Sequence, residues 1–367
     1  MKKSKNILVC PLNWGLGHTS RVVPIIFYLI EKGYDVILAA DIDIINFLKC
    51  EFPNIKTLLL PSYKVKFSKR KSQLFVLLAL IPKILYHTIK EHFLLKKIIV
   101  AHNIDIVISD NRYGLWNKHV HSIFITHQSM IKLPNGFKIF EYSLYLFIRL
   151  LVSRFDRCWI PDFNDIRNLS GDLSHKYPIS PNAEFIGPLS RFLLSNENIT
   201  TDNKIDILCV LSGPEPQRSI FESILLKQLS NVNKKIVLVR GTNIKAEDYS
   251  FKNNITVFDI CNSNKLKKLI LSASVIICRS GYSSVMDLMA LNKKAILVPT
   301  PGQTEQEYLA NYLQKQNWFY YERQNYFDVN NALGKCRKYS CNDIFNSHEL
   351  LLEAINNIVA THFVEKK

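Results

Sequence analysis

The strongest constraint on this chain is a regular alternation of short apolar runs with longer amphipathic segments. Residues 6–11, 35–40 and 56–60 are short and rich in Ile, Val and Leu, which is typical of strands buried in a parallel sheet. Helical patterns at about 19–32 and 43–51 separate these runs. Because strands that alternate with helices form parallel sheets with helices on both faces, we expect an α/β protein.

The alternation occurs in two series. The further strands are expected near 105–109, 122–126, 157–160 and 183–186 in the first series, and near 205–211, 235–240, 255–259, 275–278 and 295–299 in the second. The polar stretch 195–203 lies between the series and reads as a linker. We therefore predict a Rossmann-like domain over 1–190, a linker over 191–203, and a second such domain over 204–347. A last helix, 348–367, could pack back on the first domain. Two doubly wound domains of this kind would face a central cleft.

The net charge of the chain limits the classes of partner that it is expected to bind. Lys and Arg number 47 against 31 Asp and Glu, a formal net charge of +16. A surplus of this size favours nucleic acid, anionic lipid or phosphorylated substrates. No nucleic-acid-binding motif accompanies the charge, so we predict no nucleic-acid partner.

Neither the N-terminus nor the cysteines indicate export. The first residues are basic, but the apolar run Ile7–Cys10 is too short for a signal peptide and reads as a first strand. Eight cysteines are scattered without a CxxC or zinc-like spacing, which favours reduced, buried thiols in the cytosol. We expect a cytoplasmic protein that lies peripherally on the inner face of the plasma membrane.

The stretch 64–100 motivates that membrane prediction. Lysines and Arg70 precede the apolar run 74–82, and the following helix carries four more lysines. The run is too short to span a bilayer, but a basic cluster beside an apolar face suits a helix lying on an anionic membrane. The alternative is a solvated basic loop followed by a core helix. For the apolar stretch 140–152 we expect a helical core.

The loop after the first strand carries the first candidate site. Gly15-x-Gly17-x-x-Ser20 nearly matches the dinucleotide fingerprint, and Asp41 ends the next strand. A tight turn that uses glycine for positive φ explains the same pattern. His18, at the start of a helix, would have a lowered pKa and could act as a neutral general base toward an alcohol.

A second candidate lies at 275–287. The strand 275–278 leads into the turn Ser280-Gly281, and Ser283 and Ser284 can cap a helix that begins near Ser283. Free N–H groups at such a helix start bind anions. Asp287, one turn further, could accept hydrogen bonds from a ribose diol. An ordinary capped helix is the alternative.

Two polar residues follow strands of the first series. Asp110 comes after Ile108-Ser109, and His127 after Ile125-Thr126. The carboxyl ends of parallel strands are where α/β active sites gather. Asp110 could be an acid that binds the alcohol or the base itself, or it could cap the turn.

Four motifs in order give the chain a family resemblance. They are Gly15-Leu16-Gly17-His18 with Pro24, Gly187-Pro188-Leu189-Ser190-Arg191, Leu211-Ser212-Gly213-Pro214-Glu215-Pro216-Gln217-Arg218, and Arg279-Ser280-Gly281 with Asp287, Pro299 and the run 303–308. Together they resemble the GT-B glycosyltransferases of family 28, typified by the lipid-linked muramyl-peptide N-acetylglucosaminyltransferase. The Trp14-to-His18 loop and the Ser212-to-Arg218 loop resemble most a Bacteroidetes-type subgroup.

The resemblance implies roles for individual residues. His18 would lie near the donor phosphates and the acceptor hydroxyl, Asp287 would bind the ribose, and Arg218 would contact the diphosphate. Gln306 and Glu307 would touch the donor sugar. The full donor-binding set is Gly15, Gly17, Gly213, Arg218, Ile260, Arg279, Ser280, Gly281, Ser283, Ser284, Asp287, Gln306 and Glu307. The acceptor side would hold Trp14, Asn111, Arg112 and His127.

The sequence thus predicts an inverting glycosyltransferase that uses a nucleotide-sugar, with UDP favoured, and a glycan or lipid-linked acceptor of the cell envelope. The catalytic residues would be His18 and Asp110. We expect no cofactor and no metal, since helix dipoles and arginine would stabilise the leaving diphosphate and no Asp-x-Asp motif is present. The alternatives are a UDP-sugar epimerase of the same fold and a non-catalytic, membrane-docked binding subunit. A dehydrogenase, suggested by the Gly15-x-Gly17 pattern, would leave the motifs after residue 200 unexplained.

Overall fold

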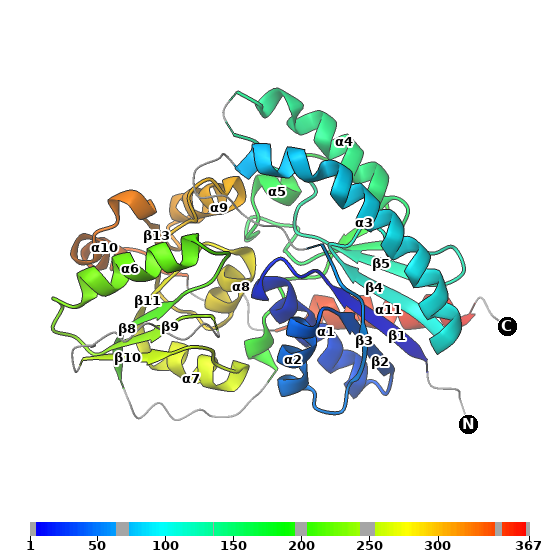
Figure 1. The fold of residues 1–367 in the computed structure, drawn as a ribbon, viewed down its shortest axis with the longest axis horizontal. Coiled ribbons are helices and arrows are strands. Elements are labelled where there is room, and N and C mark those ends of the chain that lie inside the picture. The colour runs from blue at the N-terminus through cyan, green and yellow to red at the C-terminus, as the bar shows by residue number, and fades with distance from the viewer. Residues whose placement is uncertain are drawn as a thin grey trace. The chain divides into compact units, whose positions relative to one another are not determined.

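The computed structural model describes residues 5–63, 73–134, 136–194, 204–242, 254–341 and 347–364. These residues form two compact units (Figure 1). The first unit holds the described residues of Met1–Val65, Leu74–Arg191 and Ser347–Lys367, and the second holds those of Phe192–Asn346. The predicted linker over 195–203 and the basic residues 64–72 lie outside the described residues.

The first unit is built on a parallel sheet with the strand order β3-β2-β1-β4-β5-β6-β7. Its central strands are almost wholly buried on both faces, which explains their unbroken apolar runs. The strands are β1 (Asn6–Pro11), β2 (Asp35–Ala40), β3 (Lys56–Leu59), β4 (Ile104–Asp110), β5 (His121–Ile125), β6 (Arg157–Ile160) and β7 (Ala183–Phe185).

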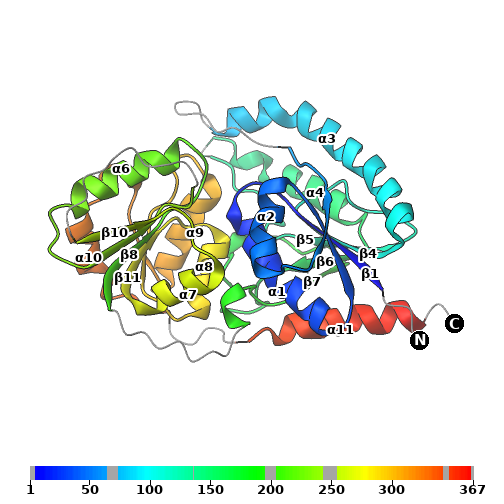
Figure 2. The ribbon, with the colours of Figure 1, turned by 60° about the horizontal axis from the view of Figure 1, so that its bottom comes forward.

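Helices cover both faces of this sheet (Figure 2). On one face lie α1, which contacts β1 and β2, and α11, which contacts α1. On the other lie α3, packed on Leu8 and Val107, and α4, packed on Phe124 and Cys158. The unit's helices are α1 (Leu16–Glu31), α2 (Ile42–Glu51), α3 (Gln73–His102), α4 (Glu141–Val152), α5 (Asp172–His175), α11 (Glu349–Val364) and the 3₁₀ turn Lys138–Phe140. A second 3₁₀ turn, Arg191–Leu193, spans the boundary between the two units.

The second unit is a smaller parallel sheet with the order β10-β9-β8-β11-β12-β13. Its core contains Phe221, Leu225 and Ile277. Its elements are β8 (Ile205–Val210), α6 (Gln217–Leu229), β9 (Ile236–Val239), β10 (Ile255–Phe258), α7 (Ser263–Ser272), β11 (Ala273–Cys278), α8 (Tyr282–Ala290), β12 (Ala295–Leu297), α9 (Thr304–Lys315), β13 (Tyr320–Tyr321), a 3₁₀ turn (Gln324–Tyr326) and α10 (Val329–Cys336).

The predicted α/β class with two parallel sheets is confirmed, and the predicted strands match those of the structure within about two residues. One strand, β13, was not predicted, because two residues carry no periodicity. The cysteines are free thiols, and seven of the eight are buried. Burial raises the pKa of Cys10 to about 12, so this thiol stays protonated.

The expectation of a buried core helix over 140–152 is wrong in part. One face of α4 packs on the sheet through Tyr145, Ile148 and Val152, but the opposite face exposes large apolar side chains such as Phe147 and Leu150. In the described part of the chain, no helix is both long and apolar enough to cross a membrane.

Candidate functional site

A polar cluster forms at the carboxyl ends of the three central strands of the first unit. His18 lies in the first turn of α1, directly after the loop that follows β1; the N-cap of that helix is Gly15, whose φ of 111° suits glycine. Asp110 is the last residue of β4, and His127 follows β5. Since β1, β4 and β5 are neighbours in the sheet, the chain brings these three residues together.

Arg21 joins the members of this cluster. Its Nε donates to both Asp110 carboxylate oxygens at 3.0 Å, and its Nη2 makes a further short contact with Oδ1. Nη1 lies 2.9 Å from His127 Nδ1, and Nη2 lies 2.7 Å from His18 Nδ1. His18 Nδ1 is also 3.1 Å from Asp110 Oδ2. The sequence reading missed Arg21, although its place three residues after His18 puts both on one face of α1.

The members of the cluster differ in solvent exposure, and this difference indicates their roles. Asp110 is fully buried and Arg21 nearly so, whereas 15% of the His18 side chain is exposed. Burial, and next the positive charge of Arg21, lower the pKa of His18, so the imidazole is neutral near pH 7. Burial alone would raise the pKa of Asp110, but Arg21 and His18 outweigh it and hold that pKa below its usual value. A neutral imidazole backed by a carboxylate can take a proton from a hydroxyl group.

The predicted acceptor-side residues lie in different settings. Trp14 is exposed, and its indole donates to Tyr63 O at 2.8 Å. Asn111 adopts a left-handed φ of 57° in the turn after β4. Arg112, by contrast, is buried and pairs with Glu91 of α3 at 2.8 Å, so the prediction that it lines an acceptor site does not fit this geometry. Gly17 lies within the first turn of α1.

The dinucleotide interpretation of the first unit fails at Asp41. A ribose-binding acid must offer its carboxylate to the ligand, but Asp41 is buried and accepts hydrogen bonds from Ser62 N at 3.0 Å and Ser62 Oγ at 2.6 Å. Asp41 therefore holds the loop after β3.

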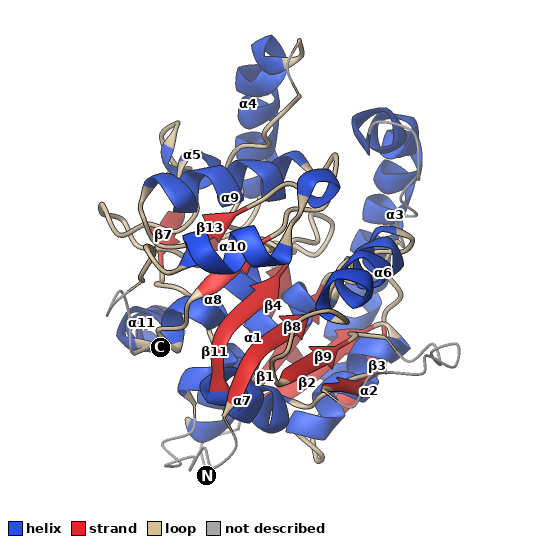
Figure 3. Ribbon diagram, turned by 90° about the vertical axis from the view of Figure 1, so that its left-hand side faces the viewer, coloured by secondary structure: helices blue, strands red, loops and turns tan. Residues whose placement is uncertain are grey.

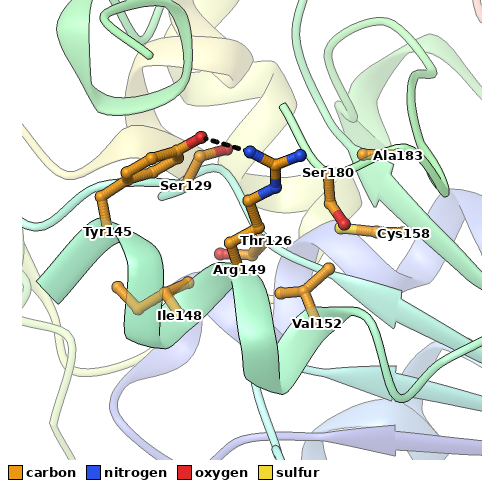
Figure 4. A pocket seen from close by; sticks show the side chains of 9 residues that line it. All are labelled: Thr126, Ser129, Tyr145, Ile148, Arg149, Val152, Cys158, Ser180 and Ala183. Carbon is orange, nitrogen blue, oxygen red and sulfur yellow. Dashed lines mark hydrogen bonds between the residues drawn. The ribbon is translucent and has the colours of Figure 1, made fainter. Parts of the chain in front are cut away.

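A narrow pocket lies between α4 and the neighbouring strands (Figure 4). Arg149 points into it and donates to Tyr145 Oη at 3.2 Å, and Tyr145 in turn donates to Pro178 O. The buried Ser180 Oγ has no hydrogen-bond partner among the described residues. The rest of the lining is mostly apolar and belongs to the packing of α4 on the sheet: Thr126, Ser129, Ile148, Val152, Cys158 and Ala183.

In the second unit, Arg218 differs from its predicted role. It is buried at the start of α6, and its guanidinium donates to Glu215 and Glu222, each at 2.6 Å, and to Ser219 Oγ at 2.7 Å. Glu222 also binds Arg240. The guanidinium therefore holds the loop before α6 in place and is not directed at a diphosphate.

Arg279, also predicted to bind the donor, is buried beneath the turn that follows β11. Its amino groups donate to four uncharged oxygens: the carbonyls of Val298, Pro299 and Gln217, and the side-chain oxygen of Gln324. The guanidinium lies 4.3 Å from the centroid of the Phe221 ring. Burial lowers the pKa of Arg279 to about 10. Arg279 thus joins the ends of β11 and β12 to the start of α6, and acts on the loops rather than on a ligand.

The start of α8 retains the features of an anion site. The helix begins at Tyr282, with Gly281 as its N-cap, so the predicted side-chain capping by Ser283 and Ser284 does not occur. The first N–H groups of any helix do not bond within the helix and can bind an anion. Asp287 lies one turn further and is 8% exposed. Ser280 Oγ donates to Gln306 O at 2.8 Å.

The remaining predicted donor residues line loops at the same carboxyl edge of the second sheet. Gln306 accepts a hydrogen bond from Thr300 N at 2.9 Å, which leaves its amide N–H groups to donate, and Glu307 accepts one from Gly302 N at 3.0 Å. Ile260 is exposed after β10, and Gly213 has a φ of 99° in the loop after β8. Among the described residues, no group of His, Cys, Asp and Glu side chains has the arrangement of a metal site.

Comparisons with known proteins agree with this architecture. Residues 207–360 match the model of the glycosyltransferase family 28 C-terminal domain. The chain is family 28-like. Its GT-B fold is shared with solved glycosyltransferases: one described as the glycotransferase of kitacinnamycin (14% identity, TM-score 0.63, covering 98% of this chain and 96% of that one), and MurG of Acinetobacter baumannii (15% identity, TM-score 0.51, covering 95% and 92%).

A curated relative points in the same direction over a shorter stretch. It is the UDP-N-acetylglucosamine--N-acetylmuramyl-(pentapeptide) pyrophosphoryl-undecaprenol N-acetylglucosamine transferase of Sulfurihydrogenibium sp. (strain YO3AOP1), 29% identical over 100 residues. The match spans 27% of this chain and 27% of that relative. The predicted resemblance to glycosyltransferase family 28 and the predicted GT-B fold are confirmed; the Bacteroidetes-type subgroup stays a prediction.

Proposed function

We propose that the chain transfers a sugar from a nucleotide donor, with UDP as the carrier, to an acceptor hydroxyl, with inversion at the anomeric carbon. The observation that carries the proposal is the His18–Asp110–Arg21 cluster in a chain whose residues 207–360 match the model of the family 28 C-terminal domain. The curated relative's name specifies a UDP-sugar and a polyprenyl-linked acceptor, which supports UDP as the carrier and a lipid-linked acceptor.

In this mechanism His18 is the base and Asp110 is its positioning partner. Only His18 of the pair reaches the surface, so it can meet an acceptor hydroxyl. With the Nδ1–H directed at Asp110, Nε2 takes the hydroxyl proton. The acceptor oxygen forms the new bond to the anomeric carbon, and the bond from that carbon to the diphosphate breaks, with its electrons leaving on UDP.

In the proposal, Arg21 supports the His18–Asp110 pair but also competes with it. It keeps Asp110 ionised, which fixes the orientation of His18 and stabilises the imidazolium that forms. However, its Nη2 lies 2.7 Å from the same His18 nitrogen that must donate to Asp110. A guanidinium donor at Nδ1 favours the tautomer of His18 that carries its proton on Nε2. His18 can therefore act as the base only when the contact between Arg21 Nη2 and His18 Nδ1 lengthens.

The second unit would bind the nucleotide. The N-terminus of α8 offers backbone N–H groups to the diphosphate, Asp287 would accept the ribose hydroxyls, and Ile260 would lie against the base. Gln306 and Glu307 would contact the sugar. We include no metal in this scheme, because helix N-termini can stabilise the departing charge.

The acceptor and location are part of the same proposal. A lipid-linked acceptor would place the protein on the cytoplasmic face of a membrane, and the stretch 64–100 would contact the anionic surface. Residues 64–72 lie outside the described residues, but the described part of α3 carries Lys83, Lys90, Lys96 and Lys97.

The test is a product analysis with radiolabelled UDP-N-acetylglucosamine and UDP-glucose, and a polyprenyl-diphosphate-linked sugar as acceptor probe. The proposal expects UDP release together with label in the extracted lipid. An epimerase would return an epimeric UDP-sugar without free UDP, and a non-catalytic subunit would bind UDP without turnover. Either result would contradict the proposal.

A further inference from the structure

Trp14 is a large aromatic residue that is exposed and yet held in one orientation. It lies in the loop between β1 and α1 and is 41% exposed, and its indole Nε1 donates a hydrogen bond to Tyr63 O at 2.8 Å. Because this bond satisfies the polar atom of the indole, the uncovered part of the side chain is the carbon surface of its rings. A rigid aromatic surface of this kind loses little conformational entropy when a ligand binds to it.

The hydrogen bonds that hold Trp14 lead back to the buried carboxylate of Asp41. Ser62 donates to Asp41 Oδ2 from its N–H at 3.0 Å and from its hydroxyl at 2.6 Å, and Ser62 Oγ accepts from Asn13 N at 3.3 Å. Two adjacent residues of the loop after β1, Asn13 and Trp14, are thus bonded to two adjacent residues of the loop after β3, Ser62 and Tyr63. Because only β2 separates β1 from β3, both loops leave the sheet at its carboxyl edge (Figures 1 and 3).

Tyr63, whose carbonyl accepts the indole hydrogen bond, is also packed against α3. Its ring centroid lies 5.2 Å from that of His87, and Lys83 Nζ lies 5.0 Å from the same centroid. An ammonium group over an aromatic face is attracted by the ring quadrupole. The Tyr63 carbonyl is therefore fixed from two sides, by the Asp41–Ser62 pair and by α3, and it fixes the indole in turn.

The position of Trp14 in the chain places it close to the proposed base. Four residues of fully extended chain span at most about 14 Å, and the first turn of α1, which begins at Leu16, shortens the path from Trp14 to His18. His18 is the member of the catalytic cluster that reaches the surface. When an acceptor hydroxyl meets His18, the rest of the acceptor lies within reach of the indole.

We infer that Trp14 is the stacking platform of a subsite for the pyranose ring of the acceptor. This inference rests on the proposed function and specifies what its acceptor site recognises. The C–H groups on one face of a pyranose form an apolar surface with partial positive charge, and the face of an indole carries partial negative charge, so the two attract. Stacking on one face leaves the sugar hydroxyls at the ring edge, where one of them can meet His18.

The geometry favours a sugar ring over the other occupants of an aromatic platform. A nucleoside is a poorer occupant, because Asp41, the acid that would bind its ribose, is buried and bonded to Ser62. The hydrocarbon chain of a lipid-linked acceptor is also a poorer one. In such an acceptor the diphosphate lies between the chain and the sugar, so the sugar that carries the reacting hydroxyl is the part nearest His18.

The test is calorimetric titration with two probes that share a decyl diphosphate, one linked to N-acetylglucosamine and one without a sugar. We expect Trp14→Ala to weaken binding of the sugar-bearing probe about fivefold or more and to leave the affinity for the sugar-free probe unchanged. The matched control, Tyr326→Ala, removes an aromatic side chain that is 79% exposed in the second unit. It should bind both probes like the wild type.

A second variant separates stacking from a structural role of the indole hydrogen bond. Trp14→Phe loses the N–H that donates to Tyr63 but keeps an aromatic face, so its affinity for the sugar-bearing probe should lie between those of the wild type and Trp14→Ala. If Trp14 acted only through its hydrogen bond, the two variants would lose the same affinity.

Three results would overturn the inference: equal losses in Trp14→Phe and Trp14→Ala, a wild type that binds the two probes equally, and a Trp14→Ala variant that loses affinity for both. Titration with UDP alone keeps these results separate from failure of the proposed function. A wild type that does not bind UDP would count against the proposed function, whereas the comparison of the two probes needs no donor and no turnover.

Discussion

Arg21 of the first unit and the buried arginines of the second unit have opposite kinds of partners. In the first unit, Arg21 lies directly against the groups proposed to do the chemistry and bonds to Asp110 and His127. In the second unit, Arg218 and Arg279 bind glutamates, carbonyls and an amide that shape the loops. A buried arginine near a strand end therefore does not by itself indicate a ligand-binding residue. Its hydrogen-bond partners show whether it supports catalytic residues or holds loops in place.

The largest effect should follow from loss of the base. His18→Gln should lower the transfer rate by about 10²- to 10⁴-fold, the contribution usual for a general base, because buried Asp110 cannot reach the acceptor in its place. UDP affinity should not change. The measurement is initial-rate kinetics on the wild type, on this variant, and on His119→Gln, which alters an exposed histidine. Equal rates for wild type and His18→Gln would remove His18 from the mechanism.

Loss of Arg21 should chiefly affect stability. Arg21→Met leaves the buried Asp110 carboxylate without its cation and should cost about 3–5 kcal/mol of unfolding free energy. The matched control is Arg167→Met, which breaks an exposed pair with Asp165 and should cost at most about 1 kcal/mol. Urea unfolding measures both. If the two variants lose the same amount, the cluster is not the buried ion pair described above.

Acid should destabilise the first unit before the second. All ten histidines lie outside the stretch Phe192–Asn346. Burial lowers the pKa of His348 from 6.5 to about 4, and its Nε2 accepts a hydrogen bond from Ser190 N. Because the folded-state pKa lies below the unfolded one, the unfolded chain takes up the proton first. Stability is therefore full above pH 6.5 and falls by up to about 3 kcal/mol as the pH drops to about 4.

The variant His348→Gln should lose less stability over that range, since an amide oxygen can accept from Ser190 without titrating. Urea unfolding of wild type and variant, above pH 6.5 and near pH 4, gives the comparison. If the unfolding free energy of His348→Gln falls as much as that of the wild type over this pH range, the acid sensitivity comes from other groups.

The smallest effect should be that of Arg218 on donor binding. Arg218→Lys keeps the charge but loses the fork that joins Glu215 to Glu222, so unfolding free energy should fall by about 1–3 kcal/mol. The dissociation constant for UDP should change less than about threefold, since the guanidinium of Arg218 is bound to Glu215, Glu222 and Ser219. A variant of unchanged stability that loses most of its UDP affinity would restore Arg218 to the diphosphate site.

Sequence alone predicted the sheets well and the buried polar network poorly. Most of the strands are rich in apolar and β-branched residues, so their positions follow from the local pattern. Arg21 was missed because nothing in its neighbours reveals that β4 and β5 place Asp110 and His127 against it. The same pattern misled at α4, where helical spacing of Leu, Tyr and Phe predicts an apolar face but not whether protein covers it.

The candidate site shows the same limit in the second unit. Glycine-rich loops and the start of α8 were found from spacing, because tight turns and helix starts are local features. Arg218 pairs with Glu215 and Glu222 within one helical turn of it, but the partners of Arg279 come from segments far apart in the chain, including Gln217, Pro299 and Gln324. Such contacts depend on tertiary packing, which one sequence does not specify.

The most direct test of the account is calorimetric titration of the wild type with UDP, GDP, dTDP and NAD, repeated on Asp287→Ala and His18→Gln. The account predicts selective binding of UDP that weakens about tenfold or more in Asp287→Ala, as expected for loss of hydrogen bonds to a charged group, and stays unchanged in His18→Gln. Tight binding of NAD, or no binding of any nucleotide, would contradict it.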